Sequence, residues 1–271
     1  MIGVRYIYHE NFKNHATPNV ALMYKPGKFN FRASYAAGFR TPTLSELYAT
    51  DIAKKNDRLT IGNLDLKPEK NNYFSLSAEY VHERFSVSVN AFYNNIRDMI
   101  DYNTIATGDK AMEQYGHKEV RQRDNIAEAK VHGINVSANA YLGAGFNLSG
   151  GYTHLNTQDV ELEQPIDKSI KNAYNINAQW AHSWKIYRLN INLNGRINSK
   201  RFSKSYGYAP EYQLWDLNTR HSFNLKSVII EPGFGMENLF DYMDDRPYNS
   251  NYATLTPGRS FYISLSLKFK S

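Results

Sequence analysis

The chain has 271 residues, 42% of them hydrophobic and none of them cysteine, so a disulfide-stapled small domain and a thiolate metal site are excluded. Its 32 Lys and Arg outnumber 26 Asp and Glu, but the basic residues are scattered and form no basic cluster, so nucleic acid is not an expected partner. No stretch of about 18 apolar residues exists, which excludes a transmembrane helix but not membrane strands, whose apolar residues alternate with polar ones.

Alternation of apolar with polar or small residues recurs along most of the chain and predicts β-strands rather than helices. About twelve strands are expected, many of them near the 9–11 residues that a tilted membrane strand needs. In chain order they lie near 2–9, 18–25, 29–39, 73–82, 86–95, 133–142, 146–155, 173–184, 187–198, 211–223, 228–240 and 260–269.

The connections between these strands are expected to alternate in length. Short turns are predicted near 25–28, 82–84, 143–145 and 185–186, and long polar links near 41–70, 102–124, 157–171, 203–211 and 241–258. The face opposite the apolar stripe is rich in Asn, Ser, Gly and Thr, which suits a water-filled lumen. Together these features favour an antiparallel transmembrane β-barrel, read as one domain over 1–271, over a soluble sandwich.

Three local irregularities are expected. The apolar positions change from odd to even numbers between Val131 and Ile134, which predicts a bulge near His132 and Gly133. Pro232 has no N–H to donate, so a bulge or weak strand pairing is predicted there. Pro42 should likewise end the strand that contains Phe39.

Five phrases in the chain carry a family resemblance. They are GFRTPTLSELY at 38–48, IGNLDLKPEKNNYFSL at 61–76, AFYNNIRDMI at 91–100, ENLFD at 237–241 and TPGRSFYISLSLKF at 256–269. In this order and spacing, the chain resembles the C-terminal β-barrel portion of TonB-dependent outer-membrane receptors. The residues that match the family motifs are Phe39, Arg40, Pro42, Glu46, Asn63, Pro68, Glu69, Asn238, Phe240, Pro257, Gly258, Arg259 and Phe269.

The resemblance implies a barrel of about 22 strands, of which this chain would supply the C-terminal part. It also implies an N-terminal plug with a TonB box, which this sequence lacks, and a C-terminal strand recognised by the barrel-assembly machinery. The N-terminus MIGVRYIYHE has no signal-peptide pattern, so we expect that any export signal would precede this sequence. The expected location is the outer membrane of a Gram-negative bacterium, in contact with its lipid.

The function implied by the resemblance is TonB-dependent uptake of a scarce nutrient, with a ferric siderophore, haem or cobalamin as the ligand. Two alternatives remain: a soluble all-β binding or adhesion module, and a small self-closed passive pore. Because neither GxSxG nor HExxH occurs, we expect no enzyme activity and no catalytic residues, and we expect no cofactor or bound metal.

Aromatic residues can stack on flat ligands and cations can pair with anionic groups, which makes the long links candidate ligand sites. The alternatives are loop packing for the aromatic residues and a barrel-wall ion pair for Arg40. The candidate ligand residues are Arg40, Tyr48, Tyr102, Tyr115, Arg121, Arg123, Tyr206, Tyr208, Arg246, Tyr248 and Tyr252.

Overall fold

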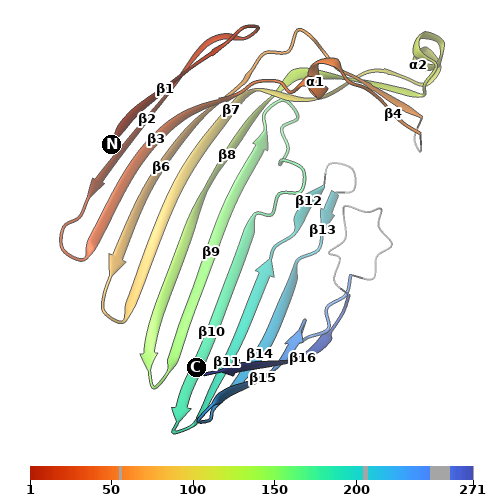
Figure 1. The fold of residues 1–271 in the computed structure, drawn as a ribbon. Coiled ribbons are helices and arrows are strands. Elements are labelled where there is room, and N and C mark those ends of the chain that lie inside the picture. Colours follow the sequence, from red (N-terminus) through yellow and green to blue (C-terminus); the bar gives the residue numbers. More distant parts are fainter. Residues whose placement is uncertain (55–56, 204–206, 245–256, 271) are drawn as a thin grey trace.

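The computed structural model describes residues 1–54, 57–203, 207–244 and 257–270 and contains one large curved sheet (Figure 1). Twelve of its strands form an antiparallel path in chain order. They are β1 (Ile2–His9), β2 (Lys13–Tyr24), β3 (Phe29–Arg40), β6 (Glu69–Val81), β7 (Phe85–Thr107), β8 (Glu119–Gly143), β9 (Phe146–Asp159), β10 (Asn172–Trp184), β11 (Tyr187–Asn198), β14 (Tyr212–Asn224), β15 (Val228–Glu237) and β16 (Ser260–Phe269).

Smaller elements lie in the long connections between these strands. They are α1 (Leu44–Tyr48), β4 (Thr50–Ala53), β5 (Arg58–Ile61), α2 (Gly108–Tyr115), β12 (Arg201–Ser203) and β13 (Gly207–Ala209). Neither α1 nor α2, the helices of the described residues, has the length and hydropathy needed to span a bilayer.

The sheet has the curvature of a barrel wall but does not close. In the described residues β1 and β16 lie at opposite ends of the strand order, and each pairs with one neighbour (Figure 1). The prediction of about twelve antiparallel strands is therefore confirmed. A small self-closed pore is not the arrangement that this structure has.

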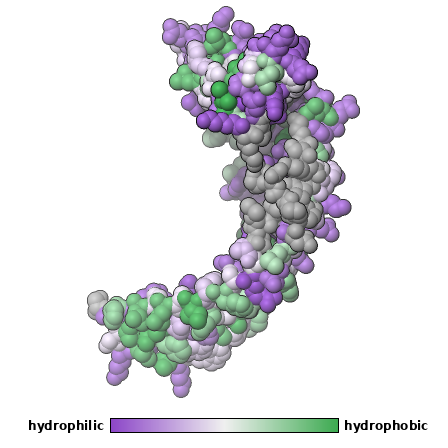
Figure 2. Space-filling model, turned by 90° about the vertical axis from the view of Figure 1, so that its right-hand side faces the viewer, coloured by the Kyte–Doolittle hydropathy of each residue, from purple (hydrophilic) through white to green (hydrophobic). Residues whose placement is uncertain are grey.

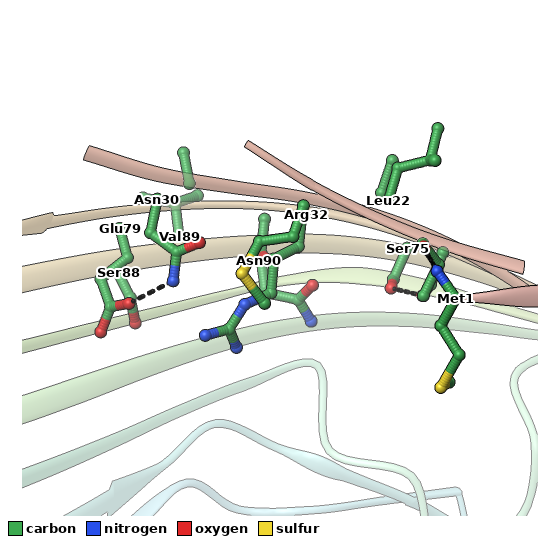
Figure 3. A pocket seen from close by; sticks show the side chains of 15 residues that line it. Met1, Leu22, Asn30, Arg32, Ser75, Glu79, Ser88, Val89 and Asn90 are labelled. Atoms are coloured by element: carbon green, nitrogen blue, oxygen red, sulfur yellow. Dashed lines mark hydrogen bonds between the residues drawn. The ribbon is translucent and has the colours of Figure 1, made fainter. Parts of the chain in front are cut away.

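The two faces of the sheet differ in chemistry, as the alternation predicted. Large apolar side chains such as Leu76 and Leu265 are 64% and 66% exposed on one face. On the other face Asn192 lies opposite Asn218, and Arg32 lies opposite Ser77. Figure 3 shows Arg32 pointing to one side of the sheet, toward its hollow, and Leu22 pointing to the other. An apolar outer face and a polar inner face suit a wall between lipid and water.

The predicted bulge at His132 and Gly133 is wrong, because the β7–β8 ladder is regular there. The apolar residues Ala129 and Val131 instead share the inner face with Phe92, whose ring lies against Gly133. The change in pattern therefore reflects apolar packing on the inner face, not a change of register. The register shifts of this ladder lie nearer the long-connection end, between Ile96 and Ala106.

The prediction of weak pairing at Pro232 is confirmed. The β14–β15 ladder pairs Arg220 with Gly233 and then resumes at Phe223 and Ile230, with no pair between. Both parts have the same register, so the interruption is not a bulge. Pro232 keeps its place opposite a residue of β16 on the other side.

The predicted long link at 102–124 is only partly a link. Strand β7 continues to Thr107 and β8 begins at Glu119, with α2 between them. At 23 and 25 residues, both strands exceed the about 9–11 residues of a membrane span. The outer part of this hairpin contains the buried apolar residues Ile100, Ala106 and Val120, but register shifts interrupt their spacing, so it lacks the regular alternation of the other strands.

Candidate functional site

The long connections gather at one end of the sheet, and the short turns lie at the other (Figure 1). The short turns near 25–28, 82–84, 143–145 and 185–186 are found as predicted, and a further one joins β14 to β15. The hydrophilic surface in Figure 2 is concentrated at the end with α1, β4 and α2. Ligand-binding side chains are therefore sought at this end.

Arg40, the last residue of β3, is held by two carboxylates of the same chain. Its Nη1 lies 2.9 Å from Glu46 Oε2, and its Nη2 lies 2.6 Å from Glu69 Oε1. Its Nε also donates to Glu69 Oε2 at 2.7 Å. Hydrogen bonds from Glu69 and Glu46 raise the pKa of Arg40 above its ordinary value. The structure thus shows the ion-pair alternative for Arg40, and β3 ends at this residue as Pro42 predicted.

The segment after β3 is fastened to the sheet by this cluster. Thr43 and Glu46 form a capping box that starts α1, and the backbone N–H of Asn63 donates to the carbonyl of Glu46 at 3.0 Å. Glu69 Oε1 also accepts the backbone N–H of Ile100 at 2.9 Å. We call Arg40, Glu46 and Glu69 the carboxylate clamp. It joins α1, β3, β6 and β7.

The pKa values of the clamp predict loosening of the connection 41–68 in acid. Burial favours the protonated form, but hydrogen bonds from Arg40 outweigh it and hold the pKa of Glu46 and of Glu69 below the ordinary value. Their stabilisation is therefore complete above that ordinary value and is lost as pH falls through the lowered pKa values. Hydrogen exchange of the full-length protein, compared with the intrinsic exchange rate at each pH, should show weaker protection of this connection as pH falls below the ordinary glutamate pKa. Unchanged protection down to strongly acidic pH would contradict this.

The family phrases at 237–241 and 256–269 are also held by hydrogen bonds within the chain. The side chain of Asn238, 5% exposed, accepts the N–H of Tyr242 at 2.9 Å and donates to its carbonyl at 2.8 Å. Asp241 accepts the backbone N–H of Arg259 at 2.7 Å. The motif residues Arg40, Glu46, Glu69, Asn238 and Arg259 therefore all have hydrogen-bond partners within the chain, which explain their positions without a ligand.

An outer platform forms where β5 pairs in parallel with the extended part of β8. One of its faces is closed by α2, with Leu59, Ala106 and Val120 packed against Ala111. Neither helix was predicted, although the Thr-x-x-Glu pattern that caps α1 is visible in the sequence.

An unpredicted ion pair also ties the platform together. His117 Nδ1 lies 2.9 Å from Asp57 Oδ1, and the hydrogen bond from this histidine lowers the pKa of Asp57. Nothing in the spacing of Asp57 and His117 indicates this contact, because it depends on the parallel pairing of β5 with β8.

The other face of the platform carries aromatic and cationic side chains. Arg123 lies over the ring of Tyr102, with its guanidinium carbon 3.6 Å from the ring centroid. Arg121 Nε lies 2.5 Å from Glu119, and Arg58 has a buried Nε without a hydrogen-bond partner in the part of the chain that is described. This face combines a flat aromatic surface with positive charge, the chemistry that a planar anionic ligand needs.

The structure brings some of the predicted ligand residues together and separates others. Tyr102, Arg121 and Arg123 share the platform face, whereas Tyr48 lies on α1, Tyr115 on α2 and Tyr208 on β13. The predicted residues Tyr206, Arg246, Tyr248 and Tyr252 lie outside the described residues. In the described ranges no group of three or more His, Asp or Glu side chains is placed to hold a metal ion.

A hollow lies against β2, β3, β6 and β7, with a volume of about 780 Å³ (Figure 3). Its lining combines apolar residues such as Met23 with polar ones, among them Arg32, Asn90 and Asn30, whose amide donates to Glu79 at 3.0 Å. The sequence predicted a polar inner face but not this hollow.

Comparison with known proteins gives one family and a set of similar folds. The family described as "TonB dependent receptor-like, beta-barrel" matches residues 1–239. A variant of the ferric enterobactin receptor from Pseudomonas aeruginosa is 20% identical with a TM-score of 0.77, and the match covers 99% of this chain and 42% of that one.

Other solved structures give similar values. The siderophore receptor PirA from Acinetobacter baumannii is 17% identical with a TM-score of 0.74, over 99% of this chain and 43% of that one. A copper transporter, OprC, is 13% identical with a TM-score of 0.71, over 95% and 40%. At these identities the likeness shows the fold alone, and the chain spans less than half the length of these proteins.

Proposed function

The chain belongs to the family of TonB-dependent receptor-like β-barrels, and from this premise we propose that it is part of an outer-membrane receptor that imports a scarce nutrient. The protein is inserted in the outer membrane of a Gram-negative bacterium, with its apolar face in contact with lipid. The complete protein takes up its ligand through a lumen and uses energy delivered by TonB to a plug domain.

The proposed ligand is a ferric siderophore. Two observations support it: one similar fold is a ferric enterobactin receptor solved in complex with enterobactin, and the platform face offers Tyr102 and Arg123 to a flat anionic group. The platform face carries the proposal, because stacking and charge pairing together suit an aromatic chelate better than a neutral sugar. Haem and cobalamin are the competing ligands.

Growth under iron limitation tests this function. Deleting the gene for the full-length protein should abolish growth on one ferric siderophore as the iron source, and the restored gene should rescue it only in a strain that has TonB. Growth of the deletion strain on every ferric siderophore offered, with a loss of growth on haem as the iron source or a loss of cobalamin-dependent growth, would reject the proposed ligand. Recovery of the protein in the aqueous fraction without detergent would reject the receptor and favour a soluble binding module.

A double substitution tests the platform face. Tyr102→Ala with Arg123→Gln should weaken binding of the ferric siderophore to the purified full-length receptor by roughly ten-fold or more, since both stacking and a cation are lost. Quenching of intrinsic fluorescence measures the affinity. Tyr24→Ala is the matched control, because this exposed tyrosine is the last residue of β2, at the short-turn end opposite the platform. Equal losses in the two variants would contradict a site on this face.

A further inference from the structure

The short turns at the end opposite the platform are strongly cationic. They contain Lys25, Lys28, Arg84, Lys185 and Lys226, all exposed, and Glu83 is the acidic residue among them. We call these five cations the turn rim. Because they come from turns spread along the curved sheet, the positive charge follows the edge of the wall and is not a single patch.

The cations of the turn rim have no ion-pair partner among the described residues. Within the described residues none of the five lies in a salt bridge. At the platform end some cations, such as Arg40 and Arg121, are paired with carboxylates, and others, such as Lys110, are in no salt bridge among the described residues. The rim therefore presents positive charge that the protein itself does not neutralise.

A band of aromatic rings runs along the apolar face beside the turn rim. On one part of the wall Tyr80 lies 4.9 Å from Phe29 and 5.6 Å from Phe85, measured between ring centroids. On another part Trp184 stacks on Tyr187 at 5.6 Å, directly beside the turn that holds Lys185. Aromatic rings of this kind settle at the level of lipid headgroups.

A second aromatic level lies toward the platform end and sets the distance between the two interfaces. On β10, Tyr174 stacks on Tyr152 at 4.7 Å, and it lies ten residues from Trp184. At about 3.3 Å per residue this is roughly 33 Å along the strand, or about 25 Å across the membrane at the usual tilt. This equals the height of the apolar band of a barrel, so the turn rim lies just beyond one headgroup layer.

We propose that the turn rim binds the phosphate groups of anionic phospholipids in the leaflet that surrounds the short turns. This inference rests on the membrane location in the proposed function. Lysine and arginine side chains reach from the turns to headgroup phosphates, while the neighbouring rings hold the wall at that depth. Unpaired cations beside an aromatic band fit a charged lipid surface, because a partner that lacked negative charge would leave them unneutralised.

Lipid retention by the full-length receptor tests the inference. The protein is purified in detergent, exposed to equal amounts of phosphatidylglycerol and phosphatidylcholine, and its bound lipids are counted by native mass spectrometry. The unmodified receptor should retain phosphatidylglycerol with a preference of roughly ten-fold. Substituting glutamine at all five rim positions, 25, 28, 84, 185 and 226, should reduce this preference to near parity.

The matched control removes the same charge from the opposite end of the sheet. It substitutes glutamine at Lys54, Lys110, Lys118, Lys168 and Lys200, which are exposed in the long connections, and it should keep the preference. The inference is overturned if the unmodified receptor shows no preference, if the rim variant keeps it, or if both variants lose it equally.

Folding and function are scored separately from lipid binding. Heat-dependent mobility on gels shows whether the rim variant forms a barrel. If the five-position rim variant forms no barrel, the double variant Lys185→Gln with Lys226→Gln is used instead. It should lose part of the preference for phosphatidylglycerol, and an unchanged preference would overturn the inference. Siderophore-dependent growth is measured on the same strains. A receptor that retains anionic lipid but imports no siderophore would reject the proposed ligand and leave the rim inference supported.

Discussion

Replacing Gly145 by alanine is expected to leave most of the protein unable to fold into the membrane. Gly145 has φ of 85°, and a Cβ at this position would lie 1.9 Å from the carbonyl oxygen of Ala181 in the neighbouring strand β10. The obstacle is backbone that also pairs with this turn, because Ala181 donates its N–H to the Gly145 carbonyl at 3.0 Å. Removing the clash breaks that pairing, so we expect a loss above about 3 kcal/mol in the free energy of unfolding.

The folded fraction of the full-length receptor measures this effect, by heat-dependent gel mobility and by the unfolding temperature. Gly27→Ala is the matched control, because Gly27 also lies in a short turn with positive φ, of 61°, but has no atom within 4 Å of the added Cβ. It should lose only the conformational strain, about 1–2 kcal/mol. If both variants folded equally well, the close approach at Gly145 would not matter as argued.

Arg40→Ala is expected to detach the connection 41–68 from the wall. It leaves the carboxylates of Glu46 and Glu69, whose side chains are 13% and 16% exposed, without their cation. Because the site is partly solvated, the expected loss is modest, about 2 kcal/mol, and local to this connection. Limited proteolysis should cut within 41–68 much faster than in the unmodified protein, while the strands remain protected.

The control for this prediction is Arg97→Ala. The Arg97 side chain is 64% exposed and lies 3.9 Å from Glu128, so its removal should cost little. Arg40→Lys should fall between the two, since an ammonium keeps the charge but cannot make the forked contacts. Proteolysis of Arg40→Ala at the rate of the unmodified protein would show that the clamp does not hold the connection.

The membrane part of the fold was predictable because lipid and water impose opposite chemistry on alternate residues. Strands such as 86–95 and 187–198 therefore stand out in the sequence. Beyond the bilayer this constraint ends. The stretch 102–124 was predicted as a link because its few apolar residues do not alternate with polar ones, although the β7–β8 ladder continues to Thr107 and Glu119. Helix α2 has only eight residues, too few to show a clear helical repeat in the sequence.

The sequence predicted which residue types form the candidate site, but not which of those residues contact each other. Tyr102 and Arg123 were among the expected ligand residues, yet their contact depends on a register fixed only after the irregularities between Ile96 and Ile100. Arg40 was correctly placed at the end of a strand, but its partner Glu69 lies 29 residues away and is brought to it by strand pairing. Such contacts follow from topology, which residue spacing does not encode.

The parallel pairing of β5 with β8 has a mechanical consequence. It joins the connection 41–68 to the tip of the β7–β8 hairpin, so the two projecting segments form one rigid arm. At its base the same arm is anchored by Glu69, which bonds both Arg40 on β3 and the backbone of Ile100 on β7. A force applied at the platform is thus transmitted through the carboxylate clamp to three strands of the wall at once, β3, β6 and β7.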